Sequence, residues 1–76
     1  MIEFGWEIDT SGLNCPLPIL KAKKALNDMV SGQVLKVIAT DPGAWRDFEA
    51  FARQTGNELV LQEKTETSFV FGLKRR

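Results

Sequence analysis

The chain has 76 residues, balances ten lysines and arginines against ten aspartates and glutamates, and is 43% hydrophobic. A domain of this size buries only about 60% of its unfolded surface, so any catalysis must take place near the surface. There is no histidine and only one cysteine, which excludes a Cys-His dyad, an internal disulfide and most zinc sites. The balanced charge argues against strong direct binding to nucleic acid or an anionic membrane. The single thiol, Cys15, is the candidate for chemistry.

The N-terminal segment and the apolar runs bear on location and organisation. The first residues are acidic and alternate in hydropathy instead of being basic and then continuously apolar, so we expect no signal peptide. No apolar run approaches membrane-spanning length. We therefore expect a cytoplasmic protein, in a reducing compartment that keeps the thiol free. No repeat or linker divides the chain, so residues 1–76 are expected to form a single domain.

The first predicted elements are a strand and a helix. Apolar residues alternate with polar residues or glycine over positions 2–9, which predicts a strand with four large apolar side chains on one face. Prolines in the first turn of a helix remove no intrahelical hydrogen bond, so Pro16 and Pro18 mark a helix start at Cys15. This helix is predicted to end near Ser31 and Gly32. The apolar positions are Ile2, Phe4, Trp6 and Ile8 in the strand, and Ile19, Ala22, Leu26 and Met29 in the helix.

The second half of the chain predicts a strand, a helix and a hairpin. Residues 34–39 are almost continuously apolar and rich in β-branched residues, as expected of a central strand. Asp41 is the candidate N-cap of the next helix, and Gly56 and Asn57 end it. Residues 58–64 and 68–74 are predicted strands joined by a short polar link. The apolar side of the second helix consists of Trp45, Phe48, Phe51 and Ala52.

The element order βαβαββ predicts the fold class. Right-handed crossovers place both helices on one face of a single sheet. We therefore expect a two-layer α/β (α+β) sandwich, with two helices packed on one face of a mixed four-stranded sheet. The residues expected to face the helices are Leu59, Leu61, Phe69, Phe71 and Leu73, and those expected on the open face are Val60, Val70, Val34 and Ile38.

The position of Cys15 favours a reactive thiol. A cysteine at a helix N-terminus has a lowered pKa, because unpaired backbone N–H groups and the helix dipole favour the thiolate. Pro16 and Pro18 stiffen the turn that carries the sulfur. A lone cysteine is often only a small buried hydrophobic residue. Here the preceding residues are mostly small and polar, which indicates an exposed junction between loop and helix.

The segment Gly12-Leu13-Asn14-Cys15-Pro16-Leu17-Pro18 resembles the TusA (SirA-like) family of small sulfur-carrier proteins, whose hallmark is a Cys-Pro-x-Pro motif at the start of the first helix. Further similarity covers Asp41-Pro42-Gly43-Ala44, with Asp47 and Phe48, and Gly56-Asn57-Glu58-Leu59. Two features depart from the family pattern. No second cysteine occurs at Phe51-Ala52-Arg53, and Trp45 stands where a small polar residue is common; we expect Trp45 in the core, the alternative being a partner contact.

The resemblance implies that Cys15 accepts sulfur as a persulfide from a cysteine desulfurase or a rhodanese and relays it to a thiol on a downstream protein. It further implies an end use in tRNA thiolation, molybdenum-cofactor assembly or sulfur oxidation. Such a relay requires no second cysteine on the same chain. We expect no bound cofactor or metal, with the covalent persulfide as the intermediate, and a monomer that visits two partners in turn. The residues that shape the motif are Gly12, Leu13, Pro16 and Pro18.

Charged residues offer possible supporting roles. Lys21, Lys23 and Lys24 could attract an acidic partner surface and add positive potential near the thiolate, although such a cluster is more often a solvated helix face. Asp9 and Asp41 receive no catalytic role, because carboxylates raise the pKa of a nearby thiol. The basic residues 74–76 could contact tRNA, but a frayed tail is the more ordinary expectation.

Two other functions remain open. A non-catalytic RNA- or protein-binding regulatory module is the first, because the predicted fold resembles a domain of a translation initiation factor. The absence of aromatic residues clustered among basic ones counts against RNA binding. The second is a peroxide-sensing thiol protein.

Overall fold

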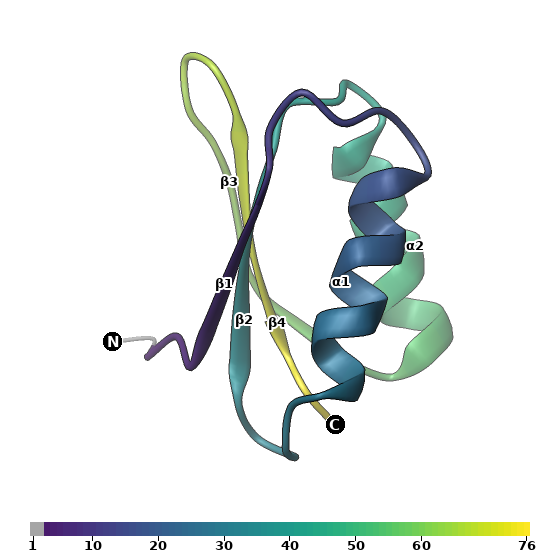
Figure 1. The fold of residues 1–76 in the computed structure, drawn as a ribbon, viewed down its shortest axis with the longest axis vertical. Helices are drawn as coiled ribbons and strands as arrows, with labels where there is room; N and C mark the ends of the chain where they lie inside the picture. Colours follow the sequence, from purple (N-terminus) through teal and green to yellow (C-terminus); the bar gives the residue numbers. More distant parts are fainter. Residues whose placement is uncertain (1–2) are drawn as a thin grey trace.

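The computed structural model describes residues 3–76 and has the predicted fold. The four strands lie in the order β1-β2-β4-β3, with β1 parallel to β2 and with β4 antiparallel to both β2 and β3. Both helices cover one face of this sheet, as Figure 1 shows. The elements are β1 (Trp6–Thr10), α1 (Leu17–Asn27), β2 (Val34–Ala39), α2 (Ala44–Thr55), β3 (Glu58–Lys64) and β4 (Phe69–Lys74).

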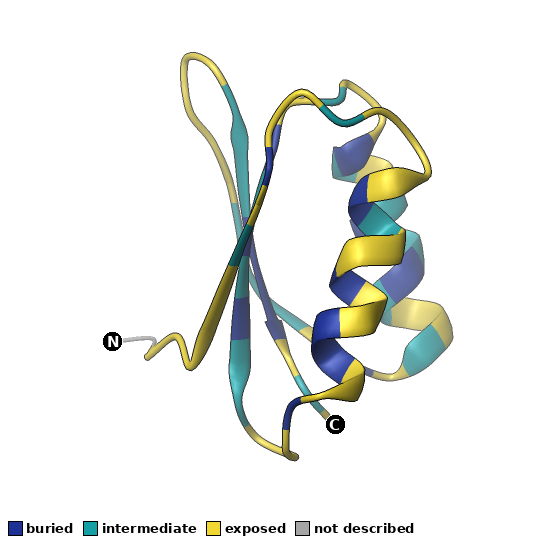
Figure 2. Cartoon of the chain, in the orientation of Figure 1, coloured by how far each residue is buried: buried dark blue, intermediate teal, exposed yellow. Residues whose placement is uncertain are grey.

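The core lies between the helices and the sheet. Figure 2 shows the buried residues of both helices on the sides that face the strands. Phe48 of α2 stacks on Phe71 of β4, with ring centroids 4.6 Å apart. Trp45 packs at the edge of this core against Phe69, at 5.7 Å between centroids, which confirms that it is a core residue. The buried apolar residues are Ala22, Ala25, Leu26, Met29, Leu35, Val37, Ala39, Ala44, Phe48, Phe51, Phe71 and Leu73.

The first helix ends earlier than the sequence predicted. Its last residue is Asn27, whereas apolar periodicity placed the end near Ser31 and Gly32. Met29 is buried just beyond the helix, so it continues the apolar pattern without being helical. The Gln33 N–H donates to the Val30 carbonyl at 3.2 Å, and this turn reverses the chain into β2.

The first strand is shorter than predicted, and its apolar residues divide between two faces. Trp6 and Ile8 pair with residues of β2 that face the helices. Phe4 lies on the opposite, open face, where its ring occupies the space that a side chain at Gly72 would need. The Lys36 ammonium lies 5.7 Å from the centroid of that ring. The prediction of one shared face is therefore wrong for Phe4, and Ile2 lies outside the described residues.

A β-bulge changes which residues of β3 face the helices. The register shifts between Leu59 and Leu61, so Leu59 packs against the core while Leu61 pairs with Gly72 and lies on the open face. Gln62 takes the inward position instead, and its amide donates to the Trp45 carbonyl at 3.3 Å. The prediction that Leu61 faces the helices is wrong, because strict alternation holds only where the register is regular. Val34, Ile38, Val60 and Val70 occupy the open face as predicted.

The second helix begins and ends at glycines. Gly43 is its N-cap, and no side chain caps this end. Asp41 instead accepts a hydrogen bond from the Gly43 N–H at 3.1 Å, so it orders the preceding turn and is not the N-cap. Gly56 ends the helix in the left-handed conformation, with φ of 79°, as glycine allows without strain.

The basic C-terminal residues are tied to the fold. The Arg75 N–H donates to the Gln33 carbonyl at 2.8 Å, and the Arg75 carbonyl accepts from the Gly32 N–H at 2.8 Å. The Arg76 N–H donates to the buried Asn57 side chain at 3.0 Å. The expectation of a frayed tail is therefore wrong, because the tail continues the pairing of β4.

Candidate functional site

Two loops form one end of the molecule. Since β1 and β2 are parallel and adjacent, the loops that leave their carboxyl ends lie together, and Figure 1 shows them above the N-termini of the two helices. The Gly12 N–H donates to the Thr40 hydroxyl at 2.8 Å, which links one loop to the other. Below them, the buried Thr10 hydroxyl donates to the Ile38 carbonyl at 2.6 Å. This arrangement brings Cys15 close to the start of α2.

Cys15 is exposed and lies two residues before the first residue of α1. The turn that carries it is closed by the Leu17 N–H, which donates to the Asn14 carbonyl at 2.8 Å. Pro18 is buried in the first turn of the helix and anchors the motif to the core. Gly12 has φ of 81°, a conformation that other residues rarely adopt. The structure thus places the thiol at the predicted junction between loop and helix, accessible to a macromolecular partner.

The electrostatic surroundings of Cys15 differ from the prediction. The pKa of the thiol lies above its usual range, because the thiol hydrogen-bonds to the Asp47 carboxylate, loses some hydration, and faces the negative charges of Asp47 and Asp41. The predicted lowering of this pKa by the helix N-terminus is therefore wrong. Both helices begin here, but the nearby carboxylates outweigh the effect of the helix dipoles.

Asp47 is the site residue that sequence reasoning missed. It lies in the first turn of α2, and the sequence named it only within the family resemblance, without a role at the thiol. A carboxylate six residues after Asp41 does not by itself predict a position near Cys15. Combined with two parallel strands whose carboxyl ends are adjacent, it could have indicated that the start of α2 approaches Cys15.

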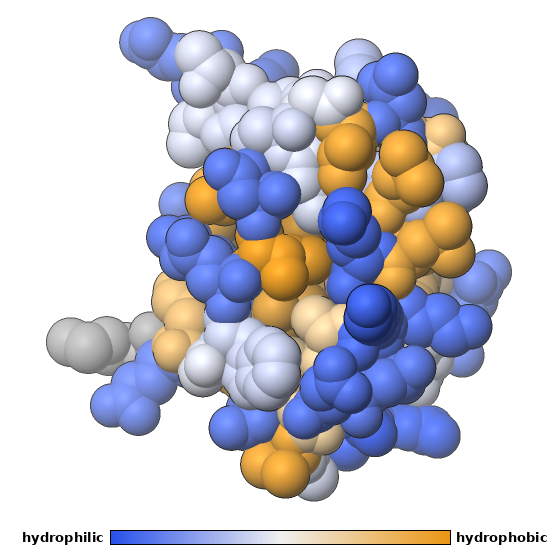
Figure 3. Space-filling view, in the orientation of Figure 1, coloured by the Kyte–Doolittle hydropathy of each residue, from blue (hydrophilic) through white to orange (hydrophobic). Residues whose placement is uncertain are grey.

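An apolar surface adjoins the thiol. Leu17 and Leu20 lie three positions apart on α1, so they share a face of the helix, and they are 45% and 53% exposed. Figure 3 shows apolar side chains gathered over the N-terminal part of α1. Isolated exposed leucines are common on protein surfaces, but Leu17 lies only two residues after Cys15, so this apolar surface begins next to the thiol.

The three lysines of α1 do not form one patch. Lys21 and Lys24 lie beside a groove with Ile8 and Asp28, whereas Lys23 lies on the other flank of the helix near the C-terminus of the chain. None of them is among the groups that shift the pKa of Cys15. Their part in partner docking stays a prediction. Asp9 interacts with Ser11 instead: the Ser11 side chain first, and then the Ser11 N–H that donates to the Asp9 carboxylate at 2.9 Å, lower the pKa of Asp9.

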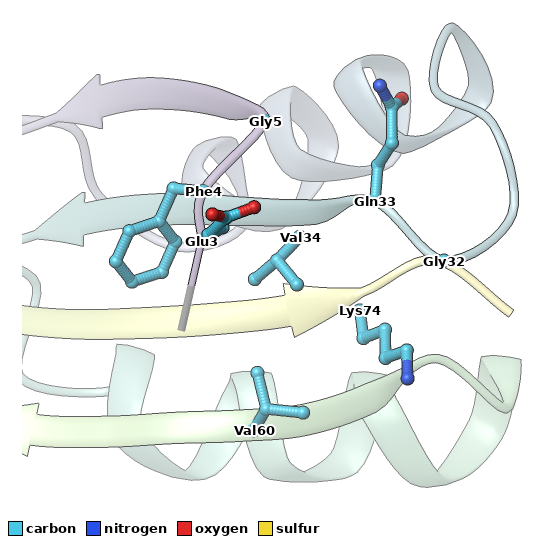
Figure 4. A pocket seen from close by; sticks show the side chains of 8 residues that line it. All are labelled: Glu3, Phe4, Gly5, Gly32, Gln33, Val34, Val60 and Lys74. Atoms are coloured by element: carbon cyan, nitrogen blue, oxygen red, sulfur yellow. The ribbon is translucent and has the colours of Figure 1, made fainter. Parts of the chain in front are cut away.

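A large cavity lies at the opposite end of the fold. It has a volume of about 640 Å³ and opens on the uncovered face of the sheet, where Figure 4 shows Phe4, Val34 and Val60 with Glu3 and Lys74 around it. Its lining residues include no thiol or hydroxyl side chain, and the start of β2 that borders it is far from the loop that carries Cys15. Cavity volume therefore does not identify the functional site here. Neither helix in residues 3–76 is long and apolar enough to cross a membrane.

Comparison with known proteins gives a consistent result. The family model of sulfurtransferase TusA matches residues 7–75. The sulfur carrier protein TusA of Allochromatium vinosum is 61% identical over 75 residues, which cover 99% of each chain. The sulfur carrier protein TusA of Pseudomonas putida is 35% identical over 69 residues, covering 91% of this chain and 86% of that protein. A SirA-like protein from Desulfitobacterium hafniense has a crystal structure with a TM-score of 0.79 and 26% identity, covering 91% of this chain and 95% of that one. The chain therefore belongs to the TusA family of sulfur carrier proteins.

Proposed function

We propose that Cys15 carries sulfur as a persulfide between two proteins. In the loading step, the Cys15 thiolate attacks the terminal sulfur of a donor persulfide, the donor S–S bond breaks, and the donor cysteine leaves as a thiolate. In the unloading step, an acceptor thiolate attacks the terminal sulfur on Cys15, and Cys15 leaves as a thiolate that takes up a proton. Each step exchanges one S–S bond for another, so neither needs an external oxidant or reductant.

The observation that carries this proposal is an exposed thiol at the loop-to-helix junction of a sulfur carrier fold. The sulfur atom must be reached by the cysteine of another protein, and an exposed position allows that approach. No second cysteine is available on the chain to form an internal disulfide with the loaded sulfur. The resolving thiol therefore belongs to the acceptor.

We further propose the classes of partner. A cysteine desulfurase or a rhodanese serves as the donor, since both present a cysteine persulfide, and the acceptor is the next protein of a sulfur relay. The end use is tRNA thiolation, molybdenum-cofactor assembly or sulfur oxidation. No bound cofactor takes part, because the transferred sulfur is held covalently. A monomer suits a carrier that visits the two partners in turn.

The test is an intact-protein mass spectrum after incubation with a cysteine desulfurase and free cysteine, without reductant. We expect wild-type protein to gain one sulfur atom and to lose it when a thiol reductant is added. Cys15→Ser should gain none while keeping the circular dichroism spectrum of the wild type, because an exposed thiol contributes little to packing.

A rhodanese loaded from thiosulfate and a simple polysulfide serve as alternative donors in the same assay. Failure of all three to load Cys15 would overturn the carrier proposal and would direct attention to RNA binding, the non-catalytic alternative. Equal gain of sulfur by wild type and Cys15→Ser would also contradict it.

A further inference from the structure

A small hollow lies at the end of the molecule opposite Cys15, between the C-terminal ends of the two helices and the end of the chain. Figure 1 shows the C-terminus beside these helix ends. The hollow has a volume of about 260 Å³ and is lined by Lys23, Arg75 and Arg76, and its other lining residues are uncharged. It therefore concentrates positive charge in a chain whose formal charges balance.

The three cations of this hollow are not neutralised by carboxylates. Within residues 3–76 none of them takes part in an ion pair. Glu58 lines the adjacent hollow, but Lys74 lines that hollow as well. The C-terminal ends of α1 and α2 border the cations and contribute about half a negative charge each. Three full positive charges outweigh them, which leaves a net charge of about +2.

Arg75 has a hydrogen-bond donor without a partner. Its guanidinium Nη1 atom donates to the Arg76 carbonyl at 3.3 Å. Its Nε atom is buried and has no hydrogen-bond partner among residues 3–76. A buried donor left unsatisfied on a charged group is costly. A guanidinium presents its Nε–H and a neighbouring Nη–H in parallel, and this fork matches two oxygens of an oxyanion. The unpartnered donor therefore indicates an oxyanion ligand.

Both arginines are held in place by the fold. The backbone of Arg75 pairs with residues 32 and 33, and the Arg76 N–H donates to the Asn57 side chain at 3.0 Å. A Cβ atom placed on Gly56 would lie 3.1 Å from the Arg76 Nη1 atom, so this guanidinium lies over the glycine that ends α2. Because these cations are positioned in advance, an anion bound here loses less free energy to the ordering of side chains.

We propose that this hollow binds a phosphate group, either as inorganic phosphate or at the end of a small phosphate monoester. A phosphate dianion matches the net charge of about +2. Its oxygens accept hydrogen bonds from the fork of Arg75, with Lys23 and Arg76 beside them. The Nε atom is buried, so the Arg75 side chain turns as the anion binds. A carboxylate has one charge and two oxygens and would satisfy fewer of these donors.

The test is a titration of the isotope-labelled full chain with inorganic phosphate, followed by two-dimensional NMR at neutral pH and constant ionic strength. We expect saturable shifts of the Arg75 Nε–H resonance and of the backbone N–H groups of Gly56, Asn57 and Arg76. Sodium chloride at the same ionic strength should cause no saturable shift. A phosphate titration that leaves the Arg75 Nε–H resonance unmoved, or equal shifts with chloride, would overturn the proposal.

Two lysines of α1 provide a matched pair of variants. Lys23→Gln removes a charge from the hollow and should weaken phosphate binding several-fold. Lys21→Gln removes the same charge from the other flank of the helix, beside the groove with Ile8, and should leave the affinity unchanged. Equal weakening by both variants would mean that phosphate responds only to overall charge, which would contradict a specific site.

Variants of Arg75 test the role of the guanidinium fork. Arg75→Gln should lower the affinity for phosphate about ten-fold or more. Arg75→Lys keeps the charge but has no Nε–H, so it should restore little of the binding. Wild-type affinity in Arg75→Lys would contradict the role of the unpartnered donor. Arg76→Gln, which should also weaken binding, keeps the test valid if the Arg75 variants fold poorly.

The source of the phosphate group is distinguished by two further ligands, glycerol phosphate and a short RNA oligonucleotide without a terminal phosphate. Glycerol phosphate should bind at least as tightly as inorganic phosphate. The oligonucleotide should bind more weakly, since each internal phosphodiester has a single negative charge. Tighter binding of the oligonucleotide with shifts at the same residues would overturn the assignment to a monoester. None of these measurements involves sulfur or Cys15, so their outcome is independent of the carrier function.

Discussion

The two ends of the molecule differ in how the chain is held at each of them. At the end that carries Cys15, both helices begin without a side-chain cap, two leucines are exposed, and neither Asp41 nor Asp47 forms an ion pair among the described residues. At the opposite end, backbone and side-chain hydrogen bonds tie Arg75 and Arg76 to the chain. The cavity of about 640 Å³ lies at the end that holds Arg75 and Arg76, whereas the reactive thiol lies at the other end. Cavity size therefore does not mark the end of this fold that carries the thiol.

A substitution in the core between the helices and the sheet should have the largest effect on stability. Phe48 is fully buried and stacks on Phe71, so Phe48→Ala should lower the free energy of unfolding by about 3–5 kcal/mol. A loss of that size approaches the whole stability of a small domain. Urea denaturation followed by tryptophan fluorescence measures it, with the exposed Arg53→Ala as a control. Separate transitions for fluorescence and circular dichroism would show that the two ends are not one cooperative unit.

The end of the molecule that holds Arg75 and Arg76 should lose stability when the buried amide of Asn57 is removed. Asn57 accepts the Arg76 N–H at 3.0 Å, and its Nδ2 atom donates to the Thr55 hydroxyl at 3.0 Å. Asn57→Ala should therefore reduce the free energy of unfolding by about 1–3 kcal/mol. The pH profile of Cys15 alkylation should stay that of the wild type. A shifted profile would mean that the two ends are coupled, contrary to the separation described above.

At the end that carries Cys15, substitution of an exposed leucine should change the rate of sulfur transfer and leave the stability of the fold nearly unchanged. Leu20→Ser, at a side chain that is 53% exposed, should change the free energy of unfolding by no more than about 0.5 kcal/mol. We expect it to slow sulfur transfer from a protein donor several-fold while leaving loading from polysulfide unchanged. Val30→Ser is the matched control, since Val30 is 65% exposed beyond the other end of α1 and its substitution should have no effect on transfer. Equal slowing by both variants would argue against a specific apolar contact.

The smallest expected effect is on stability at alkaline pH. The pKa of Cys15 is higher in the folded protein than in the unfolded chain, so folding favours the protonated form. This contribution is fully present below the ordinary thiol pKa and is lost as pH rises through the folded value. Wild-type protein should therefore become less stable relative to Cys15→Ser on the alkaline side. Denaturation curves at neutral and alkaline pH measure the difference, and a constant difference would contradict the raised pKa.

Sequence patterns predicted the fold and the position of the thiol because both depend on local chemistry. Alternation, helical periodicity and paired prolines indicate strands, helices and a helix start from neighbouring residues alone. Leu61 was assigned to the wrong face because a β-bulge depends on the register between two strands, which no single strand records. Phe4 was misplaced for a similar reason, since the space it fills is provided by Gly72 on a distant strand.

The electrostatics of the site were not predictable in the same way. The sign of the pKa shift of Cys15 depends on the side chain of Asp47, which is 32 positions away in the sequence and reaches the thiol only when α2 packs beside α1. The helix N-terminus could be read from sequence, but the stronger opposing charges could not. The hydrogen bond between Arg75 and Gln33 was likewise not predictable from the sequence, because a basic terminal segment resembles a disordered tail.

The anchoring of Arg76 has a practical consequence for capturing the binding proteins of this chain. Arg76 lies near the C-terminal ends of both helices, whereas Cys15 lies at their N-terminal ends (Figure 1). A biotin or a surface linker attached after Arg76 would therefore hold every molecule on a sensor chip with its sulfur directed into solution. Coupling through lysine would orient the molecules at random, since lysines lie on several sides of the fold. Immobilisation through the C-terminus should consequently yield a uniform layer on which binding to this end can be measured directly.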